Sequence, residues 1–361
     1  MSDNLKRFRA VRKALNKLYP KDPQGNLARH LNTLAAMISG IVGSKSTQLP
    51  QIAGKAPDGN QVESRVKQFS RWINNEKIEG ELYFLPFAES LLLQLALETL
   101  VLIIDGSVVG RGCICLMVSV VYKGRALPIA WTVVKGNKGH LPEEVHIDLV
   151  QQVKRFVPEK AEVVFLGDGE FDGINLQKVI KDYEWKYVVR TAENINIFWN
   201  DYEFKCNYLS FIININEFIG VPNVLFTNEK YGPVMIICWW KEKHKNPLYL
   251  VTDMDSAEEA CNFYLKRFRI ETLFSDQKSR GFNIDKSHLS EPERLSSLLI
   301  AACLAYIWIV YLGALCMRDG WTQIIHRTHR CDLSLFQLGL RFLDHCLNEG
   351  LSIPVAFRMI N

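Results

Sequence analysis

Residues 264–278 read Tyr-Leu-Lys-Arg-Phe-Arg-Ile-Glu-Thr-Leu-Phe-Ser-Asp-Gln-Lys. Tyr264, Arg267, Glu271 and Lys278 follow one another at intervals of three, four and seven residues. This spacing predicts that the four side chains share one face of a helix. One acid, one phenol and two cations on a single face suit a site that holds a metal ion and a phosphate backbone together. A salt-bridged amphipathic helix without such a site has the same spacing.

Two aspartates follow apolar runs that are typical of buried strands. Residues 100–104 lead to Asp105, and residues 162–166 lead to Asp168 in a glycine-rich turn. If the two strands are neighbours, their ends converge, and Glu271 can join them from the helix. Carboxylates that converge repel one another unless cations lie between them, and a pair of divalent ions about 4 Å apart meets that need. Oxygen ligands favour Mg²⁺, with Mn²⁺ as the alternative. Each aspartate alone is equally typical of a turn or a cap.

The order of elements around these acids predicts the fold class. A hairpin of two strands follows the first buried strand, and helices and strands then alternate; the predicted ranges are 113–122, 125–134, 141–156, 162–166, 174–183 and 185–190. Three strands joined by hairpins, followed by helix, strand, helix and strand, is the order of an α/β ribonuclease-H-like mixed sheet.

Composition outside this core suggests three further parts. Short apolar runs separated by Asn, Gly and Pro predict a β-rich insertion with strands at 208–215, 223–226, 234–240 and 248–251. We therefore expect the following division: a helical DNA-binding domain at 1–95, a ribonuclease-H-like core at 96–192 and 255–317, the insertion at 193–254, and a C-terminal helical region at 318–361.

The N-terminal part is basic and helical. Residues 1–85 hold 14 Lys and Arg against 7 Asp and Glu, although the whole chain of 361 residues has a net charge of only +4. A helix at 61–74 is predicted to turn Arg65, Lys67 and Arg71 outward. Short helices ending in a basic one indicate a helix-turn-helix-like unit that binds DNA. A plain helical bundle fits the same pattern.

An uncharged apolar run at 298–317 is about as long as a membrane span. It is the only such run in a composition that is otherwise typical of a globular protein, with 48% hydrophobic and 23% charged residues. We therefore predict a buried core helix and no membrane association. Nine cysteines without a Cys-x-x-Cys pair, and no N-terminal apolar run, favour a location in the cytoplasm.

The four residues of the opening stretch, with two, three and six residues between them, resemble the Tyr-Arg-Glu-Lys signature of bacterial DDE transposases of the fourth insertion-sequence family. Residues 104–107, Ile-Asp-Gly-Ser, and 167–172, Gly-Asp-Gly-Glu-Phe-Asp, are similar to the segments around that family's first and second acids. The resemblance extends over about residues 98–315.

The resemblance implies a role for each matching residue. Asp105, Asp168 and Glu271 would be the catalytic acids that bind Mg²⁺ or Mn²⁺. Arg267 and Lys278 would hold phosphates of the transposon end, and Tyr264 would hydrogen-bond to the same backbone. In relatives a tryptophan of the insertion stacks on a flipped base, for which Trp240 or its neighbour Trp239 is the candidate here. A tryptophan in a strand is also typical of a core. His140 is a candidate to approach the site from its loop, although a satisfied loop histidine is the simpler interpretation.

The function implied is that of a DNA transposase. It would bind the terminal inverted repeats of its element, cleave the ends and join the 3′ hydroxyls to target DNA. Its partners would be double-stranded DNA and a second copy of the chain on paired ends, in the bacterial cytoplasm at the nucleoid. Two alternatives remain: a ribonuclease-H-like nuclease or resolvase, and a noncatalytic DNA-binding regulator derived from a transposase.

Overall fold

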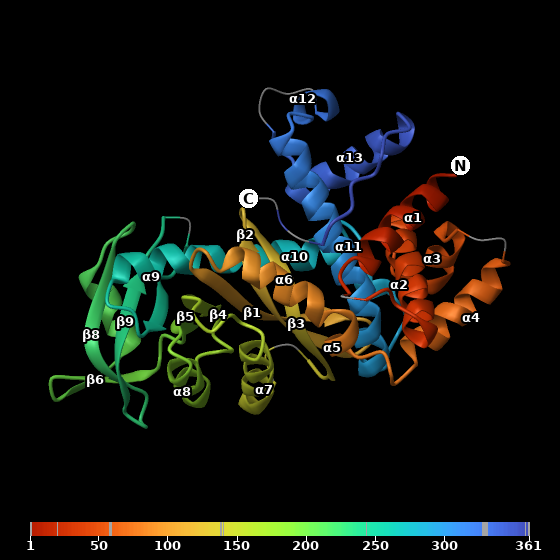
Figure 1. Cartoon of the computed structure of the whole chain (residues 1–361). Coiled ribbons are helices and arrows are strands. Elements are labelled where there is room, and N and C mark those ends of the chain that lie inside the picture. Colours follow the sequence, from red (N-terminus) through yellow and green to blue (C-terminus); the bar gives the residue numbers. More distant parts are fainter. Residues whose placement is uncertain are drawn as a thin grey trace.

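A ten-stranded mixed sheet runs through the protein in the order β3-β2-β1-β4-β5-β10-β9-β8-β6-β7 (Figure 1). The structure is a computed structural model that describes the whole chain except residues 1, 20, 58–59, 138, 140, 243, 327–330, 358 and 360–361. His140 therefore lies outside the described residues.

The first five strands form the predicted core. They are β1 (Leu100–Val109), β2 (Cys113–Tyr122), β3 (Arg125–Lys135), β4 (Val163–Gly167) and β5 (Lys186–Thr191). The strands β1, β4 and β5 are parallel to one another, whereas β2 is antiparallel to both β1 and β3. The helices α7 (Glu143–Lys154) and α8 (Ile174–Asp182) make the connections to β4 and β5. This order confirms the ribonuclease-H-like α/β mixed sheet.

The strand β1 extends further than its apolar run predicts. The sequence suggests an end at Asp105, but β1 continues to Val109 because β2 pairs with it along its whole second half. The neighbouring strand β4 stops at Gly167. Because Ile103 pairs with Leu166, Gly167 lies level with Ile104. Asp105 is thus the first residue of β1 that has no β4 neighbour on that side.

The β-rich part continues the same sheet. Its strands are β6 (Asn196–Trp199), β7 (Tyr202–Lys205), β8 (Phe218–Phe226), β9 (Tyr231–Trp239) and β10 (Leu248–Thr252), and β10 pairs antiparallel with β5. The strand predicted at 208–215 is wrong, because η1 (Cys206–Ile212), a 3₁₀ helix, occupies most of it. The residues of η1 that are buried, Cys206 and Leu209, are three apart, which is the period of a 3₁₀ helix and not of a strand.

The N-terminal part is helical, as predicted, with α1 (Asp3–Asn16), α2 (Gly25–Ser44), α3 (Leu49–Lys55), α4 (Val62–Ile73), α5 (Gly80–Tyr83) and α6 (Leu85–Leu95). Lys67 and Arg71 of α4 are exposed. Arg65 does not simply point outward, because its guanidinium donates to the carbonyls of Ala53, at 2.8 Å, and Asn60, at 2.7 Å. The carbonyl of Ala53 also accepts from the backbone N–H of Ala56, so Arg65 adds a second donor at the end of α3.

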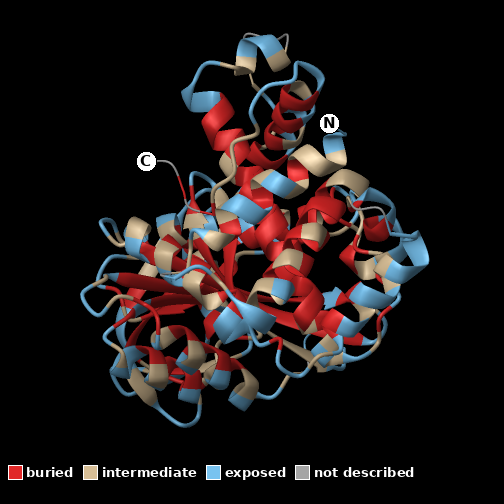
Figure 2. Ribbon diagram, turned by 45° about the vertical axis from the view of Figure 1, so that its right-hand side comes forward, coloured by how far each residue is buried: buried red, intermediate tan, exposed pale blue. Residues whose placement is uncertain are grey.

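The long apolar helix α11 (Pro292–Arg318) crosses the centre of the molecule, where Figure 2 shows it buried along most of its length. It is long and apolar enough to span a membrane by composition alone, but 94% of its most apolar 18-residue window is buried within the protein. It packs on α13 (Leu335–Asn348), which follows the short α12 (Thr322–Ile325). The predicted buried core helix is therefore confirmed by its packing.

One buried acid attaches helix α10 (Arg269–Gln277) to strand β3. Asp276 is 2% exposed, and its Oδ2 lies 3.9 Å from Nη1 of Arg125. Burial raises the pKa of Asp276 to about 6, although Arg125 acts in the opposite direction. The folded protein therefore holds this proton more tightly than the unfolded chain does. This contribution to stability is complete below about pH 4 and is lost as the pH rises through about 6.

We expect Asp276→Asn to remove this pH dependence. From pH 4.5 to pH 7.5, the free energy of unfolding of the variant relative to the wild type should rise by about 1–3 kcal/mol. Urea unfolding at both pH values measures the difference. A difference that stays constant over this range would contradict the raised pKa.

Candidate active site

The two strand aspartates lie side by side at one edge of the core. Extending the β1–β4 register from Ile103 and Leu166 by two residues puts Asp105 level with Asp168. Neighbouring strands lie about 4.8 Å apart. Asp105 is 2% exposed, whereas Asp168 is half-buried and its Oδ1 accepts a hydrogen bond from the backbone N–H of Glu170 at 3.0 Å. That local turn fixes the orientation of the Asp168 carboxylate.

The stretch at 264–278 is not one continuous α-helix, but Arg267 still contacts both Tyr264 and Glu271, so these three side chains lie on one side of it. Tyr264 ends α9 (Ala257–Tyr264), Arg267 lies in the 3₁₀ turn η2 (Leu265–Phe268), Glu271 is in the first turn of α10, and Lys278 caps its end. A 3₁₀ turn advances fewer residues per revolution than an α-helix, so it rotates α9 relative to α10. In this arrangement Arg267 is 7% exposed and faces the aspartates instead of solvent.

Arg267 contacts two of the three acids. Its Nη2 donates to Oε1 of Glu271 at 2.7 Å, and its Nη1 lies 3.7 Å from Oδ2 of Asp105. Burial by itself would lower the pKa of Arg267, yet Tyr264 and the charges of all three acids, including Asp168, raise it above its usual value. Two carboxylates that are far apart in the sequence, Asp105 and Glu271, therefore contact one guanidinium, and the charge of Asp168 acts on it from farther away.

Aromatic rings hold this guanidinium in place. Its central carbon lies 4.5 Å from the ring centroid of Phe268 and 5.9 Å from that of Tyr264. Tyr264 is 1% exposed, and burial raises its pKa to about 12. Its hydroxyl therefore stays protonated at neutral pH and keeps a proton that it can donate.

Lys278 reaches the same face of the sheet. Its Nζ donates to Oγ of Ser107 at 2.6 Å, and Ser107 follows Asp105 by two residues on β1. Residues two apart in a strand point to the same side. A cation that is only half-buried therefore lies beside the carboxylates.

The donor set fits a hard divalent cation in its chemistry, since all three side chains offer carboxylate oxygens. Within the described part of the chain, no three His, Cys, Asp or Glu side chains are close enough to form a metal-binding group. Arg267 supplies the positive charge among these acids, although its buried Nε has no hydrogen-bond partner. Glu271 has a side chain that is 54% exposed, so it can turn from Arg267 toward Asp105 without leaving a core.

The two candidate tryptophans lie along the same edge of the sheet but apart from the acids. Trp239 pairs with Leu248 of β10, beside the pairing of Tyr249 with Thr191 at the end of β5. Three strand spacings, about 14 Å, separate β9 from β4. Lys241 lies over the ring of Trp239, with Nζ 3.9 Å from the ring centroid. The Nε1 of Trp240 donates to the carbonyl of His244 at 3.2 Å, and both indoles are half-exposed.

The basic residues of α4 are separate from the carboxylates. Arg65, Lys67 and Arg71 belong to a helix that packs on α2, α3 and α11.

The sequence interpretation missed Arg190. The register of β4 with β5 pairs Gly167 with Val189, so Arg190 is level with Asp168, and its charge lowers the pKa of Tyr264. The side chain is exposed. The sequence contained a signal for Arg190, because this residue ends the predicted strand 185–190. Asp105 and Asp168 likewise follow predicted strands.

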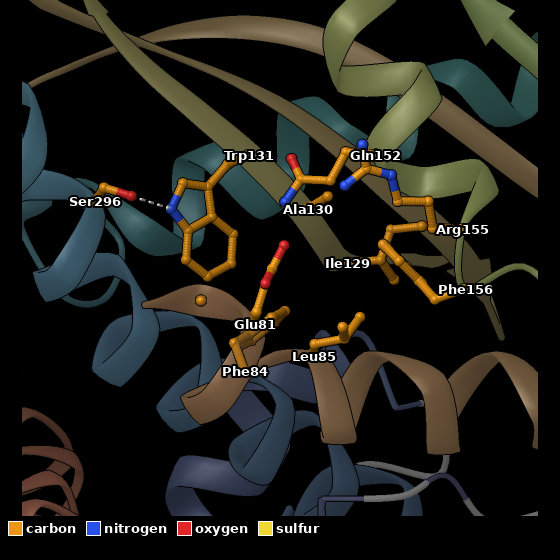
Figure 3. Close-up of a pocket in the computed structure, with 11 residues that line it drawn as sticks. Glu81, Phe84, Leu85, Ile129, Ala130, Trp131, Gln152, Arg155, Phe156 and Ser296 are labelled. Carbon is orange, nitrogen blue, oxygen red and sulfur yellow. Dashed lines mark hydrogen bonds between the residues drawn. The ribbon is translucent and has the colours of Figure 1, made fainter. Parts of the chain in front are cut away.

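A separate cavity of about 160 Å³ lies between β3, α7 and the helices α5 and α6 (Figure 3). Its wall includes Trp131, whose Nε1 donates to Oγ of Ser296 at 3.1 Å, and the charged side chains of Glu81 and Arg155. None of the three acids lines this cavity, so it does not belong to the carboxylate site.

The fold and the site together define a ribonuclease-H-like core with one acid within β1 and a second directly after the neighbouring parallel strand β4. The chain belongs to the Transposase DDE domain family, whose model matches residues 98–308, more than half of its length. That range contains all three acids. No curated protein matches the sequence.

Solved structures with similarity include the piggyBac transposase synaptic complex with hairpin DNA. It shares 11% identity at a TM-score of 0.45, over 97% of this chain and 80% of that one. Human ENDOV shares 14% identity at a TM-score of 0.28, over 57% of this chain and 83% of that one.

Proposed function

We propose that this chain is a DNA transposase that binds the terminal inverted repeats of its element, cleaves at the ends and joins the freed 3′ hydroxyls to target DNA. The observation that supports this most directly is the contact of Arg267 with both Asp105 and Glu271, beside the strand position that is level with Asp168. It occurs within the region that matches the Transposase DDE domain.

In this proposal each residue has a distinct task. Asp105, Asp168 and Glu271 hold Mg²⁺ or Mn²⁺, and such ions activate the attacking oxygen and support the leaving oxygen of a phosphoryl transfer. Arg267 turns from the acids to a phosphate of the transposon end, and Lys278 holds a neighbouring phosphate from its place beside Ser107. Tyr264 donates its hydroxyl proton to the same backbone. Trp239 or Trp240 stacks on an unpaired base.

The test is a reaction of the purified chain with a plasmid that carries the DNA flanking its gene. In Mg²⁺ we expect double-strand breaks at inverted repeats and, with target DNA added, covalent joining of the ends. Cleavage without joining would favour the nuclease or resolvase. Binding without cleavage would favour the noncatalytic regulator. We further propose that the active species is a homodimer on paired ends, in the bacterial cytoplasm at the nucleoid.

Lys278→Ala is expected to weaken binding to end DNA and to make it less sensitive to salt. One lost phosphate contact reduces the slope of log affinity against log salt by about 0.9. Fluorescence anisotropy over a salt series measures it. Lys286→Ala is the matched control, because Lys286 is an exposed lysine in the nearby turn η3 (Ile284–Lys286). An unchanged slope for Lys278→Ala would argue against a phosphate contact.

Arg267→Gln is expected to tighten Mn²⁺ binding in the absence of DNA by about tenfold, because the guanidinium occupies the carboxylates that the ion needs. Isothermal titration calorimetry measures the affinity directly and does not depend on activity. Arg269→Gln, at an exposed neighbouring position, should leave it unchanged. Equal affinities of wild type and Arg267→Gln would show that Arg267 does not compete with the ion.

A further inference from the structure

Helix α1 has one buried face and one basic face. Val11 and Leu15 are completely buried, and Arg7 is 6% exposed, on the side that packs against α2. The basic residues at positions 6, 9, 13 and 17 follow one another at intervals of three and four, so they form a row along the helix. Arg9, Lys13 and Lys17 are exposed, while Lys6 lies 3.7 Å from Asp3.

The C-terminal segment provides a second wall beside this row. A groove of about 710 Å³ lies between the row and residues 350–355, and no acidic residue is among the described residues that line it. The second wall is firmly attached, because Nε1 of the buried Trp308 donates to the carbonyl of Pro354 at 3.0 Å. Phe357 packs edge-on against Phe87, with ring centroids 5.1 Å apart.

We propose that this groove, which we call the α1 groove, binds the phosphate backbone of duplex DNA. This inference rests on the proposed function and adds a contact surface apart from α4. Eleven residues of helix separate Lys6 from Lys17, a distance of about 16 Å. Successive phosphates of one strand are farther apart along the winding backbone than their rise of about 3.4 Å along the axis, so the row can face a few of them. The groove is lined by four cations and by no acid among its described residues, so its charge is complementary to that of the phosphates.

The row on α1 holds four cations, one more than α4 does. In α4, Arg65 is engaged with backbone carbonyls, which leaves Lys67 and Arg71 exposed together with the acidic Glu63. Neither the row on α1 nor the stretch from Arg65 to Arg71 contains an acid between its first and last cation, so the number of cations distinguishes the two. The electrostatic attraction of a polyanion therefore favours α1 as a backbone contact.

The experiment compares two triple variants of the full chain. The test variant is Arg9→Gln, Lys13→Gln, Lys17→Gln. The control is Lys160→Gln, Lys178→Gln, Lys181→Gln, which removes three exposed cations at and near α8, on the opposite side of the molecule (Figure 1). The probe is a fluorescent 40-base-pair duplex of arbitrary sequence, because phosphate contacts do not depend on sequence. Thermal unfolding of each variant checks the fold.

The test variant is expected to bind about tenfold or more weakly at 0.1 M salt, with a salt slope reduced by about 2 to 3, while the control stays near the wild type. Equal losses in both variants, no loss in either, or no binding of the duplex by the wild type would overturn the α1 groove. If polyglutamate displaces the fluorescent duplex as strongly as unlabelled duplex does, DNA is not the specific occupant of the α1 groove. If the wild type binds the duplex and the test variant does not, the α1 groove is supported. If the wild type at the same time shows no cleavage in Mg²⁺, the transposase mechanism is overturned and the α1 groove is not.

Discussion

Replacement of Asp105 by asparagine is expected to reduce DNA cleavage by about a thousandfold or more, because the variant loses one of the three acids that would hold the metal ions. The substitution keeps the size of a side chain that is 2% exposed, so the strand should fold as before. Asp168→Asn and Glu271→Gln should have effects of similar size. Binding of the uncleaved DNA should remain, since phosphate contacts come from the cations. Rates of strand cleavage in Mg²⁺ and in Mn²⁺ measure the loss.

The matched control is Asp182→Asn, which removes an exposed acid at the end of α8 and should leave the rate unchanged. Retained cleavage in any one of the three variants would remove that residue from the proposed set. Loss of cleavage together with loss of DNA binding would point to misfolding, which circular dichroism of the same samples identifies.

Gly313→Val is expected to lower the free energy of unfolding by about 3 kcal/mol or to prevent folding. Helices α11 and α13 approach so closely that a Cβ on Gly313 would overlap the carbonyl of Leu335, and a Cβ on Gly339 would overlap the carbonyl of Ile309. Backbone atoms cannot move aside as a flexible side chain can. Urea or thermal unfolding measures the change, and Gly313→Ala should show a smaller loss in the same direction.

The control for this prediction is Gly54→Ala in α3, where a Cβ would meet no atom within 4 Å. Alanine favours a helix over glycine by about 1 kcal/mol, so this variant should be slightly more stable than the wild type. A loss of stability for Gly313→Ala together with a gain for Gly54→Ala would support the close contact between α11 and α13. A gain in stability for Gly313→Ala would rule it out.

Local pattern was enough for most of the core. The buried runs that lead to Asp105 and Asp168 predicted two buried strands, and their alternation with helices predicted the mixed sheet. The site was less accessible to this reasoning. The spacing of Tyr264, Arg267 and Glu271 predicted a shared face, but it reveals neither the 3₁₀ turn at Arg267 nor the burial of Arg267 beside Asp105.

Strand pairing and side-chain exposure explain the other differences. The length of β1 depends on its pairing with β2, which the apolar run before Asp105 does not contain. The run at 208–215 looked like a strand because hydrophobicity alone does not reveal which side chains are covered. Phe211 is 81% and Ile212 is 64% exposed, so these residues are apolar without being core residues.

The pairing of β10 with β5 means that the β-rich part cannot be removed without changing the core. Excision of residues 193–254 would take away the antiparallel neighbour of β5 and leave its N–H and C=O groups open along one side. Such an open strand recruits other chains, so the shortened protein should form aggregates through strand addition. Engineered versions of this protein should therefore keep β10 even where the rest of the insertion is replaced.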